Sequence, residues 1–280
     1  MKILKLKYFG ETLIPIEAEN ITPDLITGKQ LSEIERLTLY TGNREHKLSE
    51  FFDISGDVSN EVGSQMILVE GETSLVKYIG SSMSSGKIII EGNTGMHLGS
   101  KMTGGEIQVK GSVDDWAGAE MSGGYIRVNG NAGNRLGSGY RGSSEGMTGG
   151  VIVVDGNVGQ ECGALLRRGM IVIRGAVAPF AGVHMNGGQI FAFGKVSKRL
   201  GASAKGNGGF IACLGGVEQM LPTYKYDSTY KPNFMRVYLQ QLSENFGVKE
   251  AEKFMDTSFE RYSGDLACGG NNEIFIASAE

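Results

Sequence analysis

The sequence predicts a mainly β protein, a right-handed parallel β-helix of about 7–8 coils with one coil every ~19 residues. Successive glycines through the middle of the chain are 19 residues apart, except for one interval of 26 residues that marks an insertion. Each interval also contains a short alternation of β-branched residues, which is the pattern of a strand with one buried face. The recurring glycines, expected to be structural, are Gly80, Gly99, Gly118, Gly137, Gly163, Gly182 and Gly201.

The repeated unit is clearest from Gly99 to Gly111, which reads GSKMTGGEIQVKG. Alternation sends Ile107 and Val109 to the same face, where β-branched side chains belong in a core. Met102 precedes them near a corner, and a flexible thioether fills such irregular space well. The internal period of 2 favours a β-helix over helical repeats. Equivalent inward pairs are Ile88/Ile90, Ile126/Val128, Ile152/Val154, Ile171/Ile173, Ile190/Ala192 and Ile211/Cys213.

Residues 1–60 lack the repeat and are predicted to form a small α+β cap over the first open strand edge. Residues 2–8 and 38–40 are expected to be short strands. Thr22 followed by Pro23 is a typical helix entry, and residues 32–35 (SEIE) match a capping box that would open a second short helix.

Residues 61–215 form the predicted β-helix, and residues 216–280 a mixed tail. Within the tail we expect helices over residues 232–242 and 249–255 and a strand over 272–276. The outward residue of successive strands becomes apolar in the second half of the repeats, which indicates a covered surface. The tail is the expected cover, and a partner protein is the alternative. These outward residues are Leu68, Ile89, Gln108, Arg127, Val153, Val172, Phe191 and Ala212.

Composition excludes several classes of protein. The net charge of −4 provides no strong attraction to nucleic acid or anionic membranes. No apolar run approaches the ~20 residues of a membrane helix, and polar residues come too early for a signal peptide. Cys162, Cys213 and Cys268 are too scattered for a disulfide framework, a zinc site or an iron–sulfur ligand set, so a reducing cytoplasm is expected.

No catalytic or metal-binding constellation stands out. His46, His97 and His184 lack ligand spacing and are expected to be structural. Residues 137–142 (GSGYRG) match a dinucleotide fingerprint by letter, but a strand rather than a helix should follow them. We therefore expect a surface loop there, with a partner-contact loop as the alternative. Trp116 is expected to plug a corner.

One basic group is a candidate binding site. Arg135, Arg141, Arg167 and Arg168 fall in adjacent coils near the same corner. Arginine side chains bind carboxylates in a forked geometry, so these residues are candidates for contact with an acidic ligand or a partner. Scattered surface charge is the other interpretation.

The unit G-x-x-M-x-x-G-x-I-x-V-x-G resembles that of the C subunit of formylmethanofuran dehydrogenase. The resemblance includes ITPDLITGKQLSEI before the repeats, and LPTYKYD, PNFMRVYLQQL and GDLACGGNNEIFI after them. The C subunit of the bacterial formyltransferase/hydrolase complex is similar. The C-terminal domain of the glutamate synthase large subunit shares the coil pattern but not these flanks.

This resemblance implies a role in one-carbon metabolism and methanogenesis, in a complex that interconverts CO2 and formyl-methanofuran with ferredoxin-type electrons. It assigns the chemistry to partners: a tungsten or molybdenum pterin subunit like formate dehydrogenase, a zinc-dependent amidohydrolase-like subunit, and ferredoxin-like subunits with iron–sulfur clusters. This chain would be an oxidoreductase subunit with no cofactor or catalytic residue of its own, a scaffold between partners. The acidic glutamyl tail of methanofuran would suit the arginines.

Two alternatives stay open at this point. One is the C subunit of a bacterial formyltransferase/hydrolase complex, and the other is a stand-alone β-helix protein that binds or hydrolyses carbohydrate. A subunit should copurify with large metal-containing partners, whereas an independent enzyme should act as a purified monomer.

Overall fold

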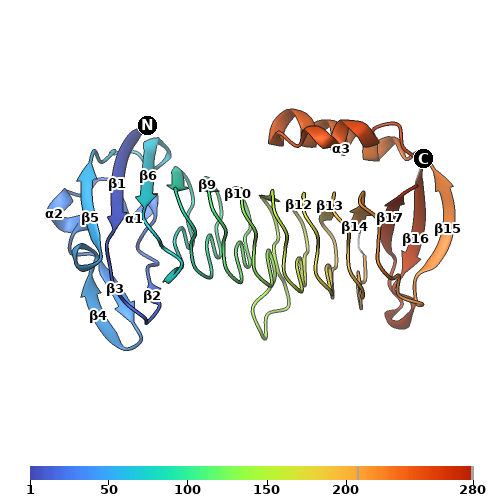
Figure 1. Cartoon of the computed structure of the whole chain (residues 1–280), viewed down its shortest axis with the longest axis horizontal. Coiled ribbons are helices and arrows are strands. Elements are labelled where there is room, and N and C mark those ends of the chain that lie inside the picture. Colours follow the sequence, from blue (N-terminus) through green and yellow to red (C-terminus); the bar gives the residue numbers. More distant parts are fainter. Residues whose placement is uncertain (207, 279–280) are drawn as a thin grey trace.

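The computed structural model describes residues 1–206 and 208–278. The chain is mainly β, and most of its strands join one mixed sheet of 13 strands. Figure 1 shows this sheet running along an elongated molecule, with the two termini near opposite ends. Pairing is parallel through the middle of the sheet, whereas antiparallel strands close it at both ends.

The middle of the sheet is built from four-residue strands, one from each sequence repeat. Consecutive strands pair in parallel, so Ile107 lies opposite Ile126, and Ile126 opposite Ile152. A second column of single parallel bridges runs from Thr73 to Val217, which ties each repeat to its neighbours at two places. These strands are β8 (Lys87–Ile90), β9 (Glu106–Val109), β10 (Tyr125–Val128), β11 (Val151–Val154), β12 (Met170–Ile173), β13 (Gln189–Ala192) and β14 (Phe210–Cys213).

The inward side chains of these strands form one continuous apolar core. The isoleucines predicted to point inward lie opposite one another in successive strands, and they are almost completely buried. The corner methionines lie in the same core, as their position in the repeat indicates. They are Met83, Met102, Met121, Met147 and Met185.

The seven recurring glycines all adopt the left-handed backbone, with φ between 59° and 74°. At Gly118 a Cβ atom would lie 2.5 Å from the Cδ1 atom of Ile152, which belongs to the next strand along the stack. The same contact recurs between Gly99 and Ile126, where the distance would be 2.7 Å. At Gly201 the space is filled instead by the hydroxyl group of Tyr224, which donates a hydrogen bond to the Gly201 carbonyl oxygen.

The N-terminal segment extends the main sheet and adds a small second sheet. Strand β1 (Lys2–Tyr8) pairs in parallel with β6 (Gln65–Glu70) and antiparallel with β5 (Phe52–Gly56). The second sheet has the order β4-β3-β2-β7. Its strands are β2 (Ile16–Glu17), β3 (Thr38–Thr41), β4 (Arg44–Lys47) and β7 (Val76–Lys77). Two 3-10 turns follow in the chain: η1 (Leu48–Glu50) leads from β4 to β5, and η2 (Val62–Ser64) leads from β5 to β6.

Both expected N-terminal helices are present, but one begins earlier than predicted. The Thr22 side chain caps α1 (Pro23–Ile26), as the sequence indicates. Helix α2 (Leu31–Ile34) is capped at Gln30, and the Glu33 carboxylate accepts a hydrogen bond from the Gln30 backbone nitrogen at 2.7 Å. The prediction that Ser32 caps this helix is therefore wrong. Glu33 stands three residues after Gln30, where a carboxylate reaches the free N–H group of the cap.

The C-terminal segment closes the other end of the sheet. Strand β17 (Asn272–Ala277) adds to β14 in parallel, and β16 (Phe259–Gly264) and β15 (Lys225–Tyr230) follow in antiparallel. The sequence did not indicate β15 or β16. The expected second helix is a 3-10 helix, η3 (Lys249–Phe254), and another short turn, η4 (Leu266–Cys268), precedes β17.

Helix α3 (Asn233–Phe246) starts one residue later and ends four residues later than expected, and Gly247 ends it with φ 67°. Its Met235, Leu239 and Leu242 side chains pack on the apolar outward residues, among them Val172 and Phe191. Figure 1 shows α3 lying across the C-terminal half of the sheet and leaving the first repeats uncovered on that side.

A charged network holds the end of α3 against the sheet. Arg127 donates hydrogen bonds to the Phe246 carbonyl oxygen at 2.6 Å and to Asp155 at 2.7 Å. Arg174 joins Asp155 to Glu250 of η3. A cation at the C-terminal end of a helix is favoured by the exposed carbonyl groups there.

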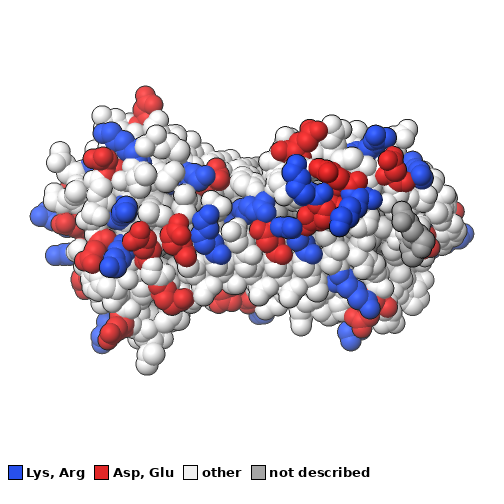
Figure 2. All heavy atoms as spheres, turned by 45° about the horizontal axis from the view of Figure 1, so that its top comes forward, with Lys and Arg blue, Asp and Glu red and all other residues white. Residues whose placement is uncertain are grey.

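Charges on the face shown in Figure 2 are of both signs and interleaved, without a large patch of one sign. Among the described helices none has the length and apolar composition needed to cross a bilayer.

Candidate functional site

One corner of the stack carries a column of non-glycine residues in left-handed backbone, one from each repeat, with φ between 59° and 69°. Each stands two residues before a recurring glycine. Such a conformation costs about 1–2 kcal/mol for an L-residue, so contacts within the column must compensate. The members, which we call the corner column, are Tyr78, His97, Trp116, Arg135, Glu161, Phe180 and Arg199.

Planar side chains of the corner column stack on one another. The rings of Tyr78 and His97 lie 4.5 Å apart at 8°, and those of His97 and Trp116 lie 5.4 Å apart at 22°. The Arg135 guanidinium sits 5.6 Å from the centre of the Trp116 ring and forms an ion pair with Glu161. These distances follow from the spacing of paired strands, ~4.8 Å, which is close to the separation at which rings stack.

The inserted segment folds back onto this column. The Tyr140 hydroxyl lies 3.0 Å from His97 Nδ1 and 2.8 Å from Ser100 Oγ, and its backbone nitrogen donates a hydrogen bond to Glu120. Burial raises the pKa of Tyr140 to about 12, so its hydroxyl remains protonated at neutral pH. Strand β11, not a helix, follows the glycine-rich loop, which removes the helix N-terminus that dinucleotide binding would need.

The structure brings two of the four candidate arginines together. Arg135 and Arg141 line a hollow of about 290 Å³ with Trp116, Asp115 and Glu161, so cations and carboxylates are balanced there. Arg141 is exposed and has no hydrogen bond or ion pair within the described part of the chain.

The other two arginines lie apart from this hollow. Arg167 pairs with Glu145 across 3.3 Å, and Arg168 is exposed. Two members of the predicted group, Arg135 and Arg167, are thus already neutralised by carboxylates.

The histidines and cysteines are dispersed. His46 of β4 bonds to Thr41 of β3 and to Glu50 of η1, and His184 is exposed near a corner. Cys162 and Cys213 are buried, and burial raises the pKa of the Cys162 thiol to about 12. Within residues 1–206 and 208–278 no three His, Cys, Asp or Glu side chains are grouped as metal ligands would be.

The corner column was not predicted from the sequence. Trp116, expected as a plug, is one of its members, with its indole nitrogen buried and unpaired among the described residues. A usable signal was present, because the residue two positions before every recurring glycine is either aromatic or charged. The fold and this corner together define an elongated, mainly β protein with a column of stacked side chains along one corner.

The chain is similar to known subunits of one enzyme. No family model matches it. The C subunit of tungsten-containing formylmethanofuran dehydrogenase 2 of Methanococcus maripaludis is 39% identical over 263 residues, which are 94% of this chain and 91% of that protein. The chain therefore belongs to the family of formylmethanofuran dehydrogenase C subunits.

Other relatives match over a shorter stretch. The C subunit of molybdenum-containing formylmethanofuran dehydrogenase 1 is 51% identical in Methanothermobacter marburgensis and 42% in Methanosarcina barkeri, each over 85 residues. Those matches cover 30% of this chain and only 20% and 28% of the two relatives.

A solved structure is similar over the whole fold. It is a chain in the crystal structure of the formyltransferase/hydrolase complex of Methylorubrum extorquens with methylofuran. The TM-score is 0.90 at 29% identity, and the match covers 98% of this chain and 100% of that one.

Replacing His97 tests the stacked corner through its pH dependence. Burial in the stack lowers the pKa of His97, Lys77 acts in the same direction, and Asp115 opposes them. The folded state therefore favours neutral imidazole, so its contribution to stability is present above the unfolded pKa of ~6.5 and is lost as pH falls through the lower folded pKa.

His97→Phe keeps a planar ring but cannot titrate. We expect its unfolding free energy, measured by urea denaturation, to decline less between pH 7 and pH 5 than that of the unaltered protein. An equally steep decline of the unfolding free energy in both proteins would show that His97 is not the source of the pH dependence.

Proposed function

We propose that this chain is a non-catalytic scaffold subunit of a formylmethanofuran dehydrogenase complex, which carries out reversible reduction of CO2 to formyl-methanofuran. It would hold together a pterin-metal subunit and an amidohydrolase-like subunit. The observation that supports this most strongly is the match to the C subunit of such an enzyme over nearly the full length of both chains.

The architecture we propose for this role is a parallel β-helix over residues 61–215, flanked by a cap over 1–60 and a tail over 216–280. Support comes from the two columns of parallel pairing, one through the strands and one through the single bridges. A stack tied at two places and filled with interlocked isoleucines is stiff, and a stiff spacer keeps catalytic partners at a fixed separation.

Metal and cofactor chemistry is assigned to partner subunits in this proposal. The relatives are named as molybdenum- and tungsten-containing enzymes. The buried thiols of Cys162 and Cys213 are poor metal ligands, because burial raises the pKa of each and a thiolate is the ligand form. Pterin-bound tungsten or molybdenum, iron–sulfur clusters and zinc would then be held by the pterin, ferredoxin-like and amidohydrolase-like partners.

A second candidate is the C subunit of a formyltransferase/hydrolase complex. The similarity to a chain of that complex from Methylorubrum extorquens, at a TM-score of 0.90, favours it. In that case the chain would hold a hydrolase and a transferase, with no redox partner.

Native purification of the tagged chain from its own host, with metal analysis, separates these functions. Copurification of large subunits with tungsten or molybdenum supports the dehydrogenase, and partners with zinc alone support the hydrolase relative. A lone monomer that binds or cleaves carbohydrate would overturn both and restore the stand-alone interpretation.

We further propose that Arg141 contacts the acidic tail of a methanofuran-type cofactor, since its guanidinium is exposed and unpaired among the described residues. Arg141→Ala in the assembled complex should raise KM for the cofactor about two- to fivefold, because an exposed ion pair contributes up to ~1 kcal/mol. Arg167→Ala is the control, since Arg167 already pairs with Glu145. An unchanged KM for Arg141→Ala would contradict a contact between Arg141 and the cofactor tail.

A further inference from the structure

We propose that the first loop of the chain is a docking surface for a partner subunit that presents an apolar side chain next to a Lys or Arg. The surface consists of Glu11, Leu13, Ile14 and Leu75, and we call it the first-loop surface. This inference rests on the proposed function, because it needs partner subunits, and it adds the face that one of them contacts.

Large apolar side chains are exposed together here. The exposed fraction is 97% for Leu13, 56% for Ile14 and 37% for Leu75. Leu75 lies beside the loop, because the Ile16 backbone nitrogen donates a hydrogen bond to its carbonyl oxygen at 2.8 Å. Scattered single exposures need no explanation, but a group of this kind marks an interaction surface.

The loop is held in shape by local contacts. The Phe9 backbone nitrogen donates to the Phe51 carbonyl oxygen at 3.0 Å, and the Thr12 hydroxyl bonds to both backbone groups of Ile14. Gly10 is pressed against its neighbours, since a Cβ there would lie 2.8 Å from the Phe51 ring and 2.9 Å from the Tyr8 ring. The apolar side chains are therefore presented by a shaped loop, which lowers the entropy cost of binding.

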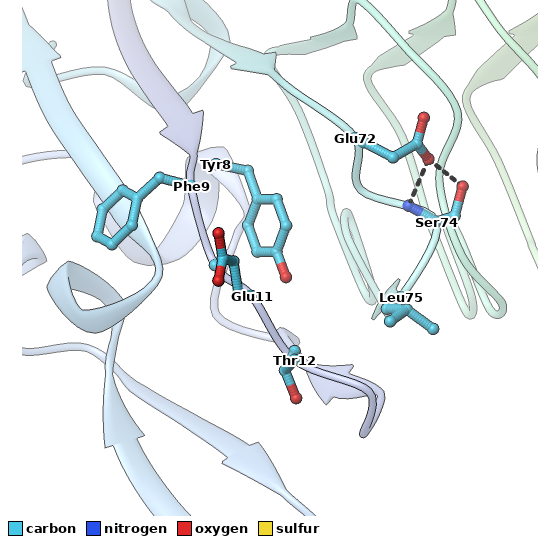
Figure 3. A pocket seen from close by; sticks show the side chains of 8 residues that line it. Tyr8, Phe9, Glu11, Thr12, Glu72, Ser74 and Leu75 are labelled. Carbon is cyan, nitrogen blue, oxygen red and sulfur yellow. Dashed lines mark hydrogen bonds between the residues drawn. The ribbon is translucent and has the colours of Figure 1, made fainter.

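A pocket of about 370 Å³ opens between this loop and residues 72–75. Figure 3 shows Tyr8 and Glu11 on the side of the first loop, and Glu72 and Leu75 on the other side. Phe9 points to the opposite side of the loop in the same view.

The rim of this pocket is acidic. Among the described residues, its lining contains two carboxylates, Glu11 and Glu72, and no Lys or Arg. Glu72 is fixed by hydrogen bonds from Ser74 and Asn93. Glu11 has no bond or ion pair within the part of the chain that the structure describes and is free to pair with a cation.

The shape and charge of this pocket indicate which kind of partner can bind at the first-loop surface. A second copy of this chain would bring acidic rims together, and an anionic lipid surface would meet the same repulsion. A partner with an apolar side chain for the pocket and a neighbouring Lys or Arg for Glu11 satisfies both features. The structure assigns this surface to a subunit of different sequence.

The first test places a charge in the apolar part of the surface. In complexes assembled from co-expressed subunits, Leu13→Asp should weaken retention of one partner subunit by about tenfold or more, as expected when a large apolar contact is replaced by a charge. Val237→Asp is the matched control, because Val237 is 67% exposed on α3, at the other end of the molecule, and undergoes the same change. Melting temperatures of both variants verify that they fold.

Equal retention of the partner by Leu13→Asp and Val237→Asp would overturn the proposal. An isolated chain that dimerises, with Leu13→Asp abolishing the dimer in sedimentation, would overturn it in favour of a second copy. Failure of the unaltered chain to retain any partner contradicts the proposed function instead, so the two failures are distinguishable.

The second test addresses the acidic rim. Glu11→Lys should weaken the same partner at low salt, and the difference from the unaltered chain should shrink as salt rises, because exposed charges are screened. A difference that is absent at low salt would contradict the assignment of a basic partner residue.

Discussion

The structure depends on a steric lock between each recurring glycine and an isoleucine of the next strand. Gly118 adopts φ 63°, and the place of its absent Cβ is occupied by the δ-methyl group of Ile152. The lock repeats along the stack, for example between Gly137 and Ile171. It fixes the register of neighbouring strands, because a shift by one residue would replace the inward isoleucine by an outward side chain. Tyr224 takes the place of the isoleucine at Gly201 and ends the series.

The register of the strands in turn determines which side chains lie side by side on the outside of the sheet. Strands that pair without a shift bring planar corner residues into stacking distance, and they align the apolar outward residues under α3. The stacking of the corner column and the packing of α3 on the sheet thus both follow from the same strand register. In the proposed complex, a partner at the first-loop surface and a cofactor tail at Arg141 would be kept apart by the same paired strands.

The sequence predicted the parts of the fold whose signals are local. Alternating β-branched residues and glycines at a fixed interval located the middle strands, and Thr22 with Pro23 located α1. Strands β15 and β16 were missed because KYDSTY and FERYSG do not alternate, and their stability comes from pairing with distant segments. The four arginines were grouped too widely. Arg135 and Arg141 line one hollow, whereas Arg167 pairs with Glu145 outside it, and the sequence did not indicate how the insertion that carries Arg141 folds.

A double-mutant cycle on Gly118 and Ile152 tests the lock most directly. Gly118→Ala should lower the unfolding free energy by about 2–4 kcal/mol, from left-handed strain and overpacking. Gly142→Ala, which has φ 88° and open space around it, should cost only the strain of about 1 kcal/mol. In an Ile152→Val background, which lacks the δ-methyl group, Gly118→Ala should cost less by about 1 kcal/mol or more. Additive effects of the two changes would contradict the lock.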